Sequence, residues 1–481
     1  MTTNPSPFID GAWARPESAA TIDVRSARTG QPIGSAVSAS RADVDAAVAA
    51  ARRAFDQPGG WAHWPAADRA AALDRLADAL GKRAEQTVRL VSEQNGMPIS
   101  VARQIEGQFP GALLSYYAGL VRSQETETSR PGMFGGTTRV HREPAGVIAA
   151  ISPWNFPQTL AAQKYAPALA AGCTVVLKPA PETVLDTAAV GEAALEAGLP
   201  PGVLNIVPAE AEVSSYLVGH PGVDAVTFTG STAIGKRIAA ICGPLVRPVT
   251  LELGGRSAAV ILDDADLDLG RAGEALFGSM IINNGQTCFL STRILAPRSR
   301  YAEVVDTLAA FARSLTVGDP LDPETQIGPL VTQRRRDEVA AAVEKGVADG
   351  ARLVAGGGYP ADLTEGWYFQ PTVLADVDNS WAIARDDIFG PVLTVTAYDD
   401  EDQAVALAND SDYGLAGTVW TADADRGLAV ARRLRTGSVG VNGYLPDLGA
   451  PFGGVKHSGI GRELGPDGLA AYQRTKSIYQ L

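Results

Sequence analysis

Residues 147–178 read VIAAISPWNFPQTLAAQKYAPALAAGCTVVLK, and this stretch decides the fold. Its two ends are apolar runs, Val147–Ile151 and Thr174–Leu177, each bounded by turn residues. The segment between them, Gln158–Ala171, has a helical pattern. Strand–helix–strand alternation with continuously apolar strands is typical of a parallel, doubly wound sheet covered on both faces.

The same alternation extends in both directions along the chain. Further strands are predicted at Val203–Val207, Ala225–Thr229 and Val249–Leu253, with helices at Glu182–Ala197 and Ser231–Ile241. A second series, which predicts a second α/β domain, comprises Ala258–Leu262, a helix near Leu269–Asn283, Val392–Ala397 and Gly417–Trp420. Near the N-terminus, Ser40 and Asp43 form a capping box for a helix over Arg41–Phe55, and a second helical region runs from about Pro65 to Gly96.

Composition limits the class of protein. The 481 residues are 46% hydrophobic and 20% charged, which excludes a disordered or fibrous chain. With 41 Lys and Arg against 54 Asp and Glu, the net charge of −13 argues against nucleic acid or an anionic membrane as partner. The absence of an apolar run of about 18 residues predicts no membrane span, and the first thirteen residues show no secretory pattern. Only three cysteines occur, which favours a reducing cytoplasm.

One strand-to-helix turn has the composition of a phosphate site. Gly230-Ser-Thr-Ala-Ile-Gly235-Lys236-Arg237 follows a predicted strand, but Arg237 stands where a nucleotide-hydrolysing loop needs Ser or Thr for Mg²⁺. The usual G-x-G-x-x-G dinucleotide fingerprint is absent. A pyrophosphate-binding turn and a plain tight turn before a helix explain this segment equally well.

The three cysteines differ in their surroundings. Cys173 enters an apolar strand and Cys242 ends a helix, so both are interpreted as small buried residues. Cys288 lies in the polar segment Asn283-Asn-Gly-Gln-Thr-Cys288, where an exposed loop cysteine is either a nucleophile or a surface residue without a role. The four histidines are scattered and pair with no cysteine at ligand spacing, so no metal site is predicted.

A nucleophile needs a base and an oxyanion donor, and two residues fit these roles. Glu252 interrupts the end of an apolar strand just before two glycines, where desolvation raises a carboxyl pKa toward that of a general base. The alternative is a structural carboxylate that accepts backbone N–H groups. Asn155 follows a predicted strand, where its amide can donate to an oxyanion. If the segment is taken alone, a turn residue between two prolines is the favoured interpretation.

Taken together, the motifs resemble the aldehyde dehydrogenase superfamily over nearly the whole chain. The matching segments, in family order, are SPWNFP at 152–157, LKP at 177–179, FTGSTAIG at 228–235, LELGG at 251–255, GQTC at 285–288, IFGPV at 388–392 and PFGGVKHSGIGRE at 451–463.

The resemblance implies a role for each matched residue. Cys288 is the expected nucleophile, Glu252 the general base, and Asn155 with the backbone N–H of Cys288 the oxyanion hole. The expected contacts of NAD or NADP are Trp154, Lys178, Gly230, Ser231, Asp387 and Phe389. The implied reaction is attack of the Cys288 thiolate on an aldehyde, hydride transfer to the cofactor, and hydrolysis of the thioester to a carboxylic acid.

Three positions depart from the family pattern. Pro181 stands where NAD-preferring members carry a ribose-binding glutamate, which predicts activity with both NAD⁺ and NADP⁺. Asp387 replaces the usual glutamate and is one methylene shorter. Arg256 replaces a lysine and is interpreted as a peripheral change.

The residues near the family's substrate tunnel are mostly apolar and include no arginine. They are Phe156, Leu160, Gln163, Ile282, Thr287, Phe289 and Leu445. A medium-sized aliphatic or aromatic aldehyde is therefore expected rather than a dicarboxylic semialdehyde. Three alternatives stay open: an ester or thioester hydrolase that uses the same Cys and Glu, a CoA-acylating dehydrogenase, and a catalytically silent scaffold.

The resemblance also implies a division of the chain. A doubly wound, Rossmann-like cofactor domain comprises residues 1–124 and 145–255, an α/β catalytic domain residues 256–445, and a small β oligomerisation element residues 125–144 and 465–481. In relatives the latter pieces form a projecting sheet that pairs across subunits. A homo-oligomer, either a dimer or a tetramer, is therefore expected.

Overall fold

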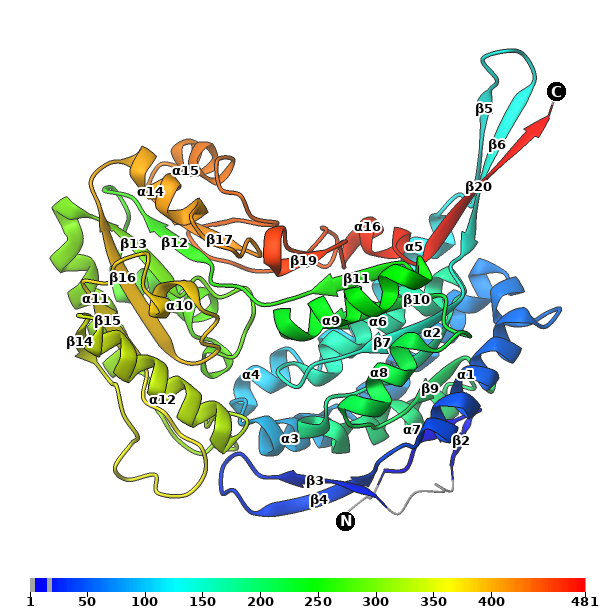
Figure 1. The fold of residues 1–481 in the computed structure, drawn as a ribbon, viewed down its shortest axis with the longest axis horizontal. Helices are drawn as coiled ribbons and strands as arrows, with labels where there is room; N and C mark the ends of the chain where they lie inside the picture. The colour runs from blue at the N-terminus through cyan, green and yellow to red at the C-terminus, as the bar shows by residue number, and fades with distance from the viewer. Residues whose placement is uncertain (1–4, 15–19, 481) are drawn as a thin grey trace.

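The computed structural model describes residues 5–14 and 20–480 (Figure 1). The expected absence of a leader rests in part on residues 1–4, and Leu481 ends the expected C-terminal strand; these residues lie outside the described ranges. The α/β class is confirmed, because two sheets of mainly parallel strands carry helices on their faces. Along the described ranges, no helix is long and apolar enough to cross a membrane.

The larger sheet has eight strands and is built around the segment that opens the sequence argument. Its order is β19(Gly459–Ile460), β11(Val249–Glu252), β10(Ala225–Thr229), β7(Val147–Ile151), β8(Thr174–Lys178), β9(Leu204–Ile206), β1(Phe8–Ile9) and β2(Ala12–Trp13). The five strands from β11 to β9 are parallel. The chain winds outward from β7 in both directions, which is the predicted doubly wound order.

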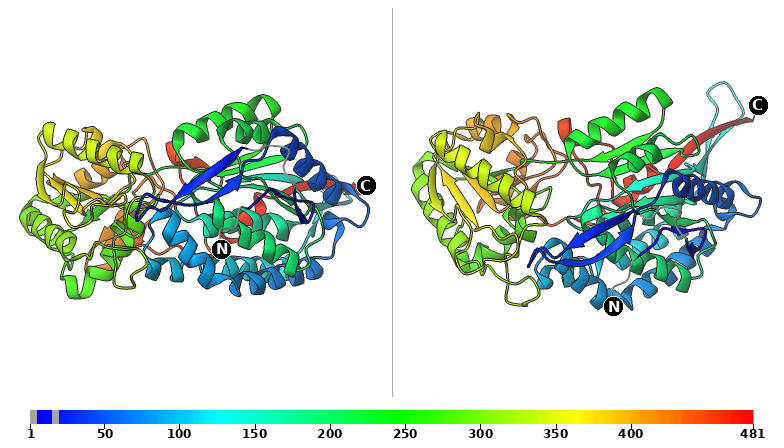
Figure 2. Two further views of the ribbon diagram at one scale, coloured as in Figure 1. Left: turned by 90° about the horizontal axis from the view of Figure 1, so that it is seen from below. Right: turned by 60° about the horizontal axis from the view of Figure 1, so that its bottom comes forward.

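Helices cover both faces of this sheet (Figure 2). Ile148 and Ala150 of β7 pack toward one set of helices, and Val147, Ala149 and Ile151 pack toward the other, so the whole strand is buried. The first set is α2(Ala66–Gly81), α5(Phe109–Ser123), α6(Pro157–Ala171) and α7(Ala188–Glu196). The second set is α1(Arg41–Asp56), α8(Ala211–Gly219) and α9(Thr232–Cys242).

The second sheet has seven strands, in the order β14(Arg352–Ala355), β15(Thr372–Ala375), β16(Val392–Tyr398), β13(Arg293–Pro297), β12(Ala258–Ile261), β17(Gly417–Trp420) and β18(Gly440–Val441). All pairs are parallel except that of β14 with β15. Its helices are α10(Leu269–Met280), α11(Tyr301–Ser314), α12(Gln333–Ala348), α13(Ala382–Arg385), α14(Glu401–Asn409) and α15(Ala424–Ala431).

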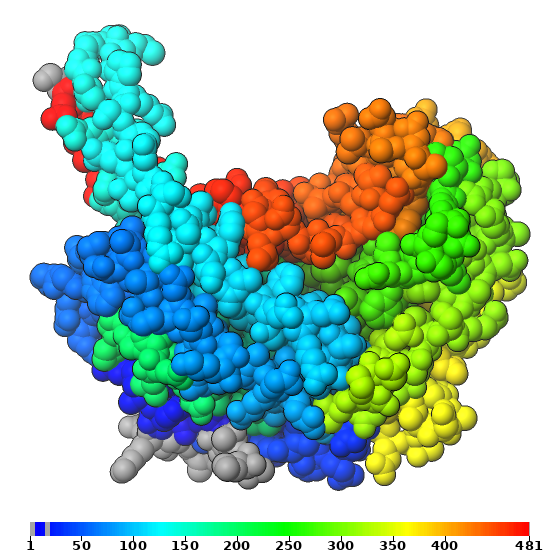
Figure 3. Space-filling model, turned by 180° about the vertical axis from the view of Figure 1, so that it is seen from behind, coloured from blue at the N-terminus to red at the C-terminus, as the bar shows by residue number. Residues whose placement is uncertain are grey.

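A three-stranded antiparallel sheet projects from the body of the molecule (Figures 1 and 3). It joins the hairpin β5(Glu127–Pro131) and β6(Thr137–Pro144) to the C-terminal β20(Gln473–Gln480), which pairs with β6 from Gln473 to Gln480. The remaining elements are the hairpin β3(Thr21–Arg25) and β4(Pro32–Val37), and the helices α3(Ala84–Asn95), α4(Ile99–Gln104) and α16(Gly465–Ala470).

The structure confirms the capping box of α1, where Ser40 and Asp43 cap each other's backbone N–H groups. Three helix predictions need correction. The helix expected over Glu182–Ala197 begins as a 3₁₀ turn, Pro181–Thr187, because Thr183 has non-helical dihedral angles. The helical region from Pro65 to Gly96 is divided into α2 and α3, and the helix expected to reach Asn283 ends at Met280.

Candidate active site

The first of two cavities that meet at Cys288 opens at the carboxyl ends of β7, β10 and β11, where α/β sheets bind ligands. Its volume is about 410 Å³. Five of the residues expected to contact the cofactor line this cavity: Trp154, Gly230, Ser231, Asp387 and Phe389. Ser231 is the N-cap of α9, so the first backbone N–H groups of that helix face the cavity and suit a phosphate.

Close backbone approaches shape this cavity. A Cβ atom at Gly230 would lie 2.4 Å from the Phe228 ring, and one at Gly254 would lie 2.3 Å from Asp387 Oδ2. Phe389 has a φ of +53° and meets the Trp154 ring edge-on at 5.4 Å. Left-handed backbone in a non-glycine residue is costly and is commonly retained at ligand sites.

Two charged residues expected at the cofactor differ in position. Burial raises the pKa of Asp387 to about 6, although the charges of Arg256 and Arg335 oppose the shift. Lys178 ends β8 and does not line the cavity. Burial lowers the pKa of Lys178 to about 8, while the nearby charges of Glu182 and Glu210 act in the opposite direction.

The second cavity is an apolar tunnel with a volume of about 230 Å³. All seven residues expected near the substrate line it, and the structure adds Gln104, Ile105, Phe109, Thr159, Tyr444, Pro446, Leu448, Phe452 and Leu464. Phe289 and Tyr444 stack at 4.8 Å, and the Tyr444 hydroxyl lies 2.6 Å from Ser438 Oγ. Thr159, Tyr444 and Pro446 are chain neighbours of the expected residues, whereas nothing in the sequence indicates that residues 104–109 and 448–464 reach the tunnel.

Cys288 lines both cavities. The segment before it is held by its own amide side chains. Asn284 Nδ2 donates to Gly96 O and Pro329 O, both at 2.8 Å, and Gln286 Oε1 accepts from Val331 N at 3.0 Å. These bonds explain why a polar sequence forms a buried, fixed loop.

The expectation of an exposed cysteine is corrected, because Cys288 is only partly accessible. Burial raises the pKa of its thiol to about 12, and the charges of Glu252 and Asp387 contribute to the shift. The thiol is therefore protonated at neutral pH, and a base must remove the proton when the sulfur attacks.

Asn155 is buried beside this loop and lines the first cavity. The Asn155 Nδ2 donates to Gln286 O at 3.0 Å, which fixes the side-chain amide. The backbone carbonyl of Asn155 accepts from Asn283 Nδ2 at 2.9 Å. One N–H of the amide remains available to an oxygen atom bound near Cys288.

Glu252 is 3% exposed, and neither of its carboxylate oxygens has a hydrogen-bond partner among the described residues. A structural role as acceptor of backbone N–H groups is therefore not observed. Burial raises its pKa well above the usual value, the charge of Glu463 adds to the shift, and Lys164 and Arg462 oppose it. Glu252 lies against Gly453, where a Cβ atom would come within 2.5 Å of Oε1.

Sequence reasoning did not identify the ion pair behind Glu252. Lys164 Nζ lies 2.6 Å from Glu463 Oε1, and both side chains are buried. The available signal in the sequence was that Lys164 is the only charged residue of the buried helix α6.

Arg256 is not peripheral, which corrects the sequence interpretation. It is 3% exposed and donates a hydrogen bond to Thr292 Oγ1 and another to Ile383 O.

Comparison with known proteins gives a consistent result. A model of the aldehyde dehydrogenase family matches residues 13–478. Geranial dehydrogenase from Castellaniella defragrans is 53% identical over 474 residues, which cover 98% of both chains.

Solved structures match as closely. An aldehyde dehydrogenase from Mycobacterium tuberculosis in complex with NAD⁺ superposes with a TM-score of 0.97 at 45% identity, covering 100% of this chain and 99% of that one. A variant of aldehyde dehydrogenase C from Pseudomonas syringae, in complex with NAD⁺ and octanal, gives 0.95 at 38% identity, covering 99% and 97%.

Proposed function

Because this chain belongs to the aldehyde dehydrogenase family, we propose that Cys288, Glu252 and Asn155 are its catalytic residues and that its substrate is an apolar aldehyde. The protein oxidises an aldehyde to the carboxylic acid with NAD(P)⁺. The observation that carries the residue assignment is the position of Cys288, which borders both the polar cavity and the apolar tunnel.

In the first half of the reaction, the Cys288 sulfur attacks the aldehyde carbon at the inner end of the tunnel. Its proton leaves for the ionised carboxylate of Glu252, whose raised pKa makes it a stronger base. The carbonyl oxygen becomes an oxyanion, which accepts from Asn155 Nδ2 and from the backbone N–H of Cys288. Loss of hydride from the former aldehyde carbon then leaves a thioester on Cys288.

In the second half, Glu252 acts as a base. It releases the first proton to solvent, and its carboxylate then removes a proton from a water molecule that attacks the thioester carbon. The same two donors hold the second oxyanion. The C–S bond breaks, the acid leaves, and the Cys288 sulfur recovers a proton.

The polar cavity fits a nicotinamide dinucleotide. The N-terminus of α9 suits the pyrophosphate, and the glycines at 230 and 254 allow the Phe228 ring and the Asp387 carboxylate to approach the backbone at the cavity wall. Trp154, Phe389 and Asp387 would contact the nicotinamide half. When bound, the cofactor supplies the acceptor for the hydride.

The tunnel supports an apolar substrate. Among the described residues that line it, none carries a charge, and four are phenylalanines: Phe109, Phe156, Phe289 and Phe452. A charged group placed there would lose its hydration without gaining a partner. We therefore favour a medium-sized aliphatic, terpenoid or aromatic aldehyde, such as octanal, geranial or benzaldehyde.

A panel of aldehydes tests this substrate class. The formation of reduced cofactor is followed at 340 nm with octanal, geranial, benzaldehyde, betaine aldehyde and succinic semialdehyde. We expect kcat/KM for the first three to exceed that for the charged pair by about 100-fold or more, or about 3 kcal/mol. Ester hydrolysis without any aldehyde oxidation would favour the hydrolase alternative, and comparable values across the panel would contradict the tunnel argument.

We further propose a preference for NAD⁺, because Glu182 and Glu210 lie close enough to Lys178 for their charges to raise its pKa. Negative charge at this position disfavours the 2′-phosphate of NADP⁺. The two cofactors are compared with octanal by kcat/KM, which also tests the sequence expectation that both are used. A preference for NAD⁺ above roughly 1,000-fold, about 4 kcal/mol, would mean that one of these glutamates replaces the one missing at Pro181.

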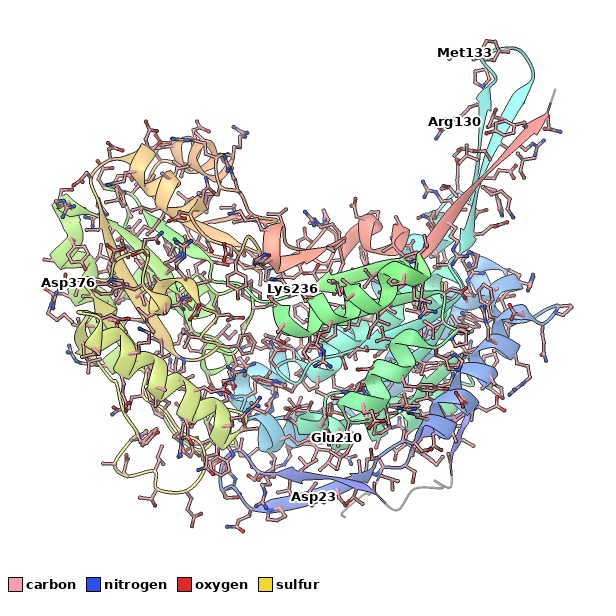
Figure 4. The ribbon with its side chains drawn as sticks, in the orientation of Figure 1. Asp23, Arg130, Met133, Glu210, Lys236 and Asp376 are labelled. Carbon is pink, nitrogen blue, oxygen red and sulfur yellow. The ribbon has the colours of Figure 1, made fainter. Side chains whose placement is uncertain are left out.

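The domain boundaries expected from the sequence are retained as a proposal, with the addition that β19 joins residues 459–460 to the first sheet. We also propose a homo-oligomer, because β5 and β20 each leave one edge of the projecting sheet unpaired among the described residues. The tip of its hairpin carries Met133 (Figure 4) and Phe134, both more than 90% exposed. The three free thiols fit the proposed location in the cytoplasm.

A further inference from the structure

Two buried arginines lie where the second sheet meets the Cys288 loop. Arg256 precedes β12, and Arg293 is the first residue of β13; their side chains are 3% and 2% exposed. Their hydrogen-bond acceptors are neutral oxygen atoms: Thr292 Oγ1 and Ile383 O for Arg256, and Asn379 Oδ1, Leu407 O, Ala408 O and Arg256 O for Arg293.

Neither guanidinium forms an ion pair with a residue that the structure describes. The carboxylates whose charges act on Arg256 are Asp387 and Asp386, and that acting on Arg293 is Asp410. Asp410 already pairs with Arg385 at 3.1 Å. Two buried cations without a contacting anion are unfavourable, since buried charges are normally paired.

The remaining neighbours make the region more positive. The Lys456 ammonium donates to Asn409 O at 2.8 Å and to Ser411 O at 2.9 Å, and its pKa is lowered by desolvation and by the charges of Arg435 and Arg293. The charge of Asp412, which directly follows Ser411, raises the pKa of Lys456 and so opposes this shift.

A small cavity adjoins the two arginines. Its volume is about 10 Å³, and its wall includes Arg256, Arg293 and Ser257. Arg256 Nε and Ser257 Oγ are buried and have no hydrogen-bond partner within the described ranges. The cavity therefore combines two guanidinium groups without a contacting anion, two unused hydrogen-bond donors and room for one small sphere.

We propose that this cavity binds a single halide ion, chloride in the cell, with Arg256 Nε–H and the Ser257 hydroxyl as donors and Arg293 as a second source of positive charge. A water molecule would satisfy the donors but leave both guanidiniums without a counter-charge. Sulfate and gluconate are too large for the space. The site does not depend on the proposed catalytic roles.

The ion would stabilise the turn behind the reactive loop. Ser257 and Arg256 directly follow Gly255, at which a Cβ atom would lie 2.7 Å from Cys288 O. Binding to the folded protein alone raises its stability with the logarithm of ligand concentration. Chloride is therefore expected to raise the melting temperature in proportion to the logarithm of its concentration once the site is largely occupied.

The test compares the melting temperature in sodium chloride, sodium bromide and sodium gluconate at equal ionic strength. We expect the melting temperature to rise with the logarithm of chloride or bromide concentration and not with that of gluconate. Arg256→Lys, which keeps the charge but removes Nε, and Ser257→Ala should each lose most of the halide-specific rise. Arg271→Lys, at a side chain 69% exposed, is the matched control and should retain it.

Crystals grown in bromide give the second readout, which does not depend on a variant folding. An anomalous peak between Arg256 and Ser257 is expected. Equal melting temperatures in chloride and gluconate, or a cavity that holds only water in the bromide crystal, would overturn the proposal.

Discussion

The reactivity of Cys288 depends on an environment that keeps its thiol protonated until substrate arrives. Burial and the charge of Glu252 hold the thiol pKa near 12, so the free enzyme is protected from adventitious alkylation and oxidation. Cys288→Ala should lower dehydrogenase turnover at least about 10⁴-fold, the scale on which nucleophile removal acts, while NAD⁺ still binds. Steady-state assay and calorimetric titration of NAD⁺ measure the two effects.

The other cysteines provide controls for this prediction. Cys173 and Cys242 are 0% and 1% exposed and line neither cavity. Cys173→Ala and Cys242→Ala should change the melting temperature while leaving kcat close to that of the wild type. Substantial turnover by the Cys288 variant would remove this residue from the mechanism.

Glu252 accepts a proton in both halves of the proposed reaction, and a glutamine can accept one in neither. Glu252→Gln retains the shape of the side chain, so cofactor should still bind while steady turnover falls by about 10²–10⁴-fold. Rapid mixing separates the two halves, because a burst of reduced cofactor, with the acyl-enzyme visible by mass spectrometry, would show that deacylation is slowed more than acylation. A normal steady rate without a burst would contradict the assignment.

At the residue scale, sequence analysis identified those candidate site residues that lie within a short recognisable motif. Cys288, Asn155 and Glu252 each lie in a short motif, and their motifs come together in the fold. The Lys164–Glu463 pair and the burial of Arg256 were not predicted. Lys164 and Glu463 lie 299 positions apart, and the surroundings of Arg256 come from β13 and α13.

Among the elements, α6 links the substrate tunnel to a buried carboxylate. Glu106, which follows α4, accepts from Gln158 N at 2.8 Å and Thr159 N at 3.3 Å, so it caps the first turn of α6. The same helix presents Thr159, Leu160 and Gln163 to the tunnel. Burial raises the pKa of Glu106 to about 7, and the charge of Asp186 contributes.

The raised pKa of Glu106 makes the free energy of unfolding depend on pH. The folded protein holds the Glu106 proton up to about pH 7 and the unfolded chain only to about 4.5, so the free energy of unfolding falls as pH rises through this window. Glu106→Gln removes the titration. The stability of the variant relative to wild type should therefore rise by up to about 3 kcal/mol between pH 4.5 and 8.

Urea unfolding at several pH values measures this difference. Glu85→Gln, at an exposed side chain on α3, is the control and should follow the wild-type curve. Parallel curves for wild type and Glu106→Gln would show that this carboxyl does not titrate in the folded state as expected.

The strands that were predicted agree with the structure almost to the residue, because strands buried on both faces form continuous apolar runs. The equally buried strands β13 and β15 were not predicted. Ala225–Thr229 and Gly417–Trp420 agree with β10 and β17. Helix ends were less accurate where tertiary contacts decide them. At Gly285, with a φ of +75°, a Cβ atom would lie 2.2 Å from Gly390, a contact that local sequence does not indicate.

At the scale of the whole molecule, residues of a single chain line both cavities. The projecting sheet extends away from the rest of the fold (Figure 1). Neither cavity is lined by a residue of β5, β6 or β20. Assembly through this sheet would therefore serve stability rather than chemistry. Its outer surface includes Ile478 and Tyr479, which are 42% and 74% exposed.

The last prediction tests this role of the sheet. Deletion of the residues after Arg474 removes nearly all of β20 and leaves β6 as an unpaired edge beside the exposed Phe134. We expect a smaller assembly in sedimentation velocity at micromolar concentration and a melting temperature lower by several degrees, with kcat per active site little changed. Val246→Ser, a change at an equally exposed apolar residue outside this sheet, should leave the assembly intact. The proposal requires that the full-length protein forms an assembly. Sedimentation of the full-length protein as a monomer under these conditions would therefore contradict it.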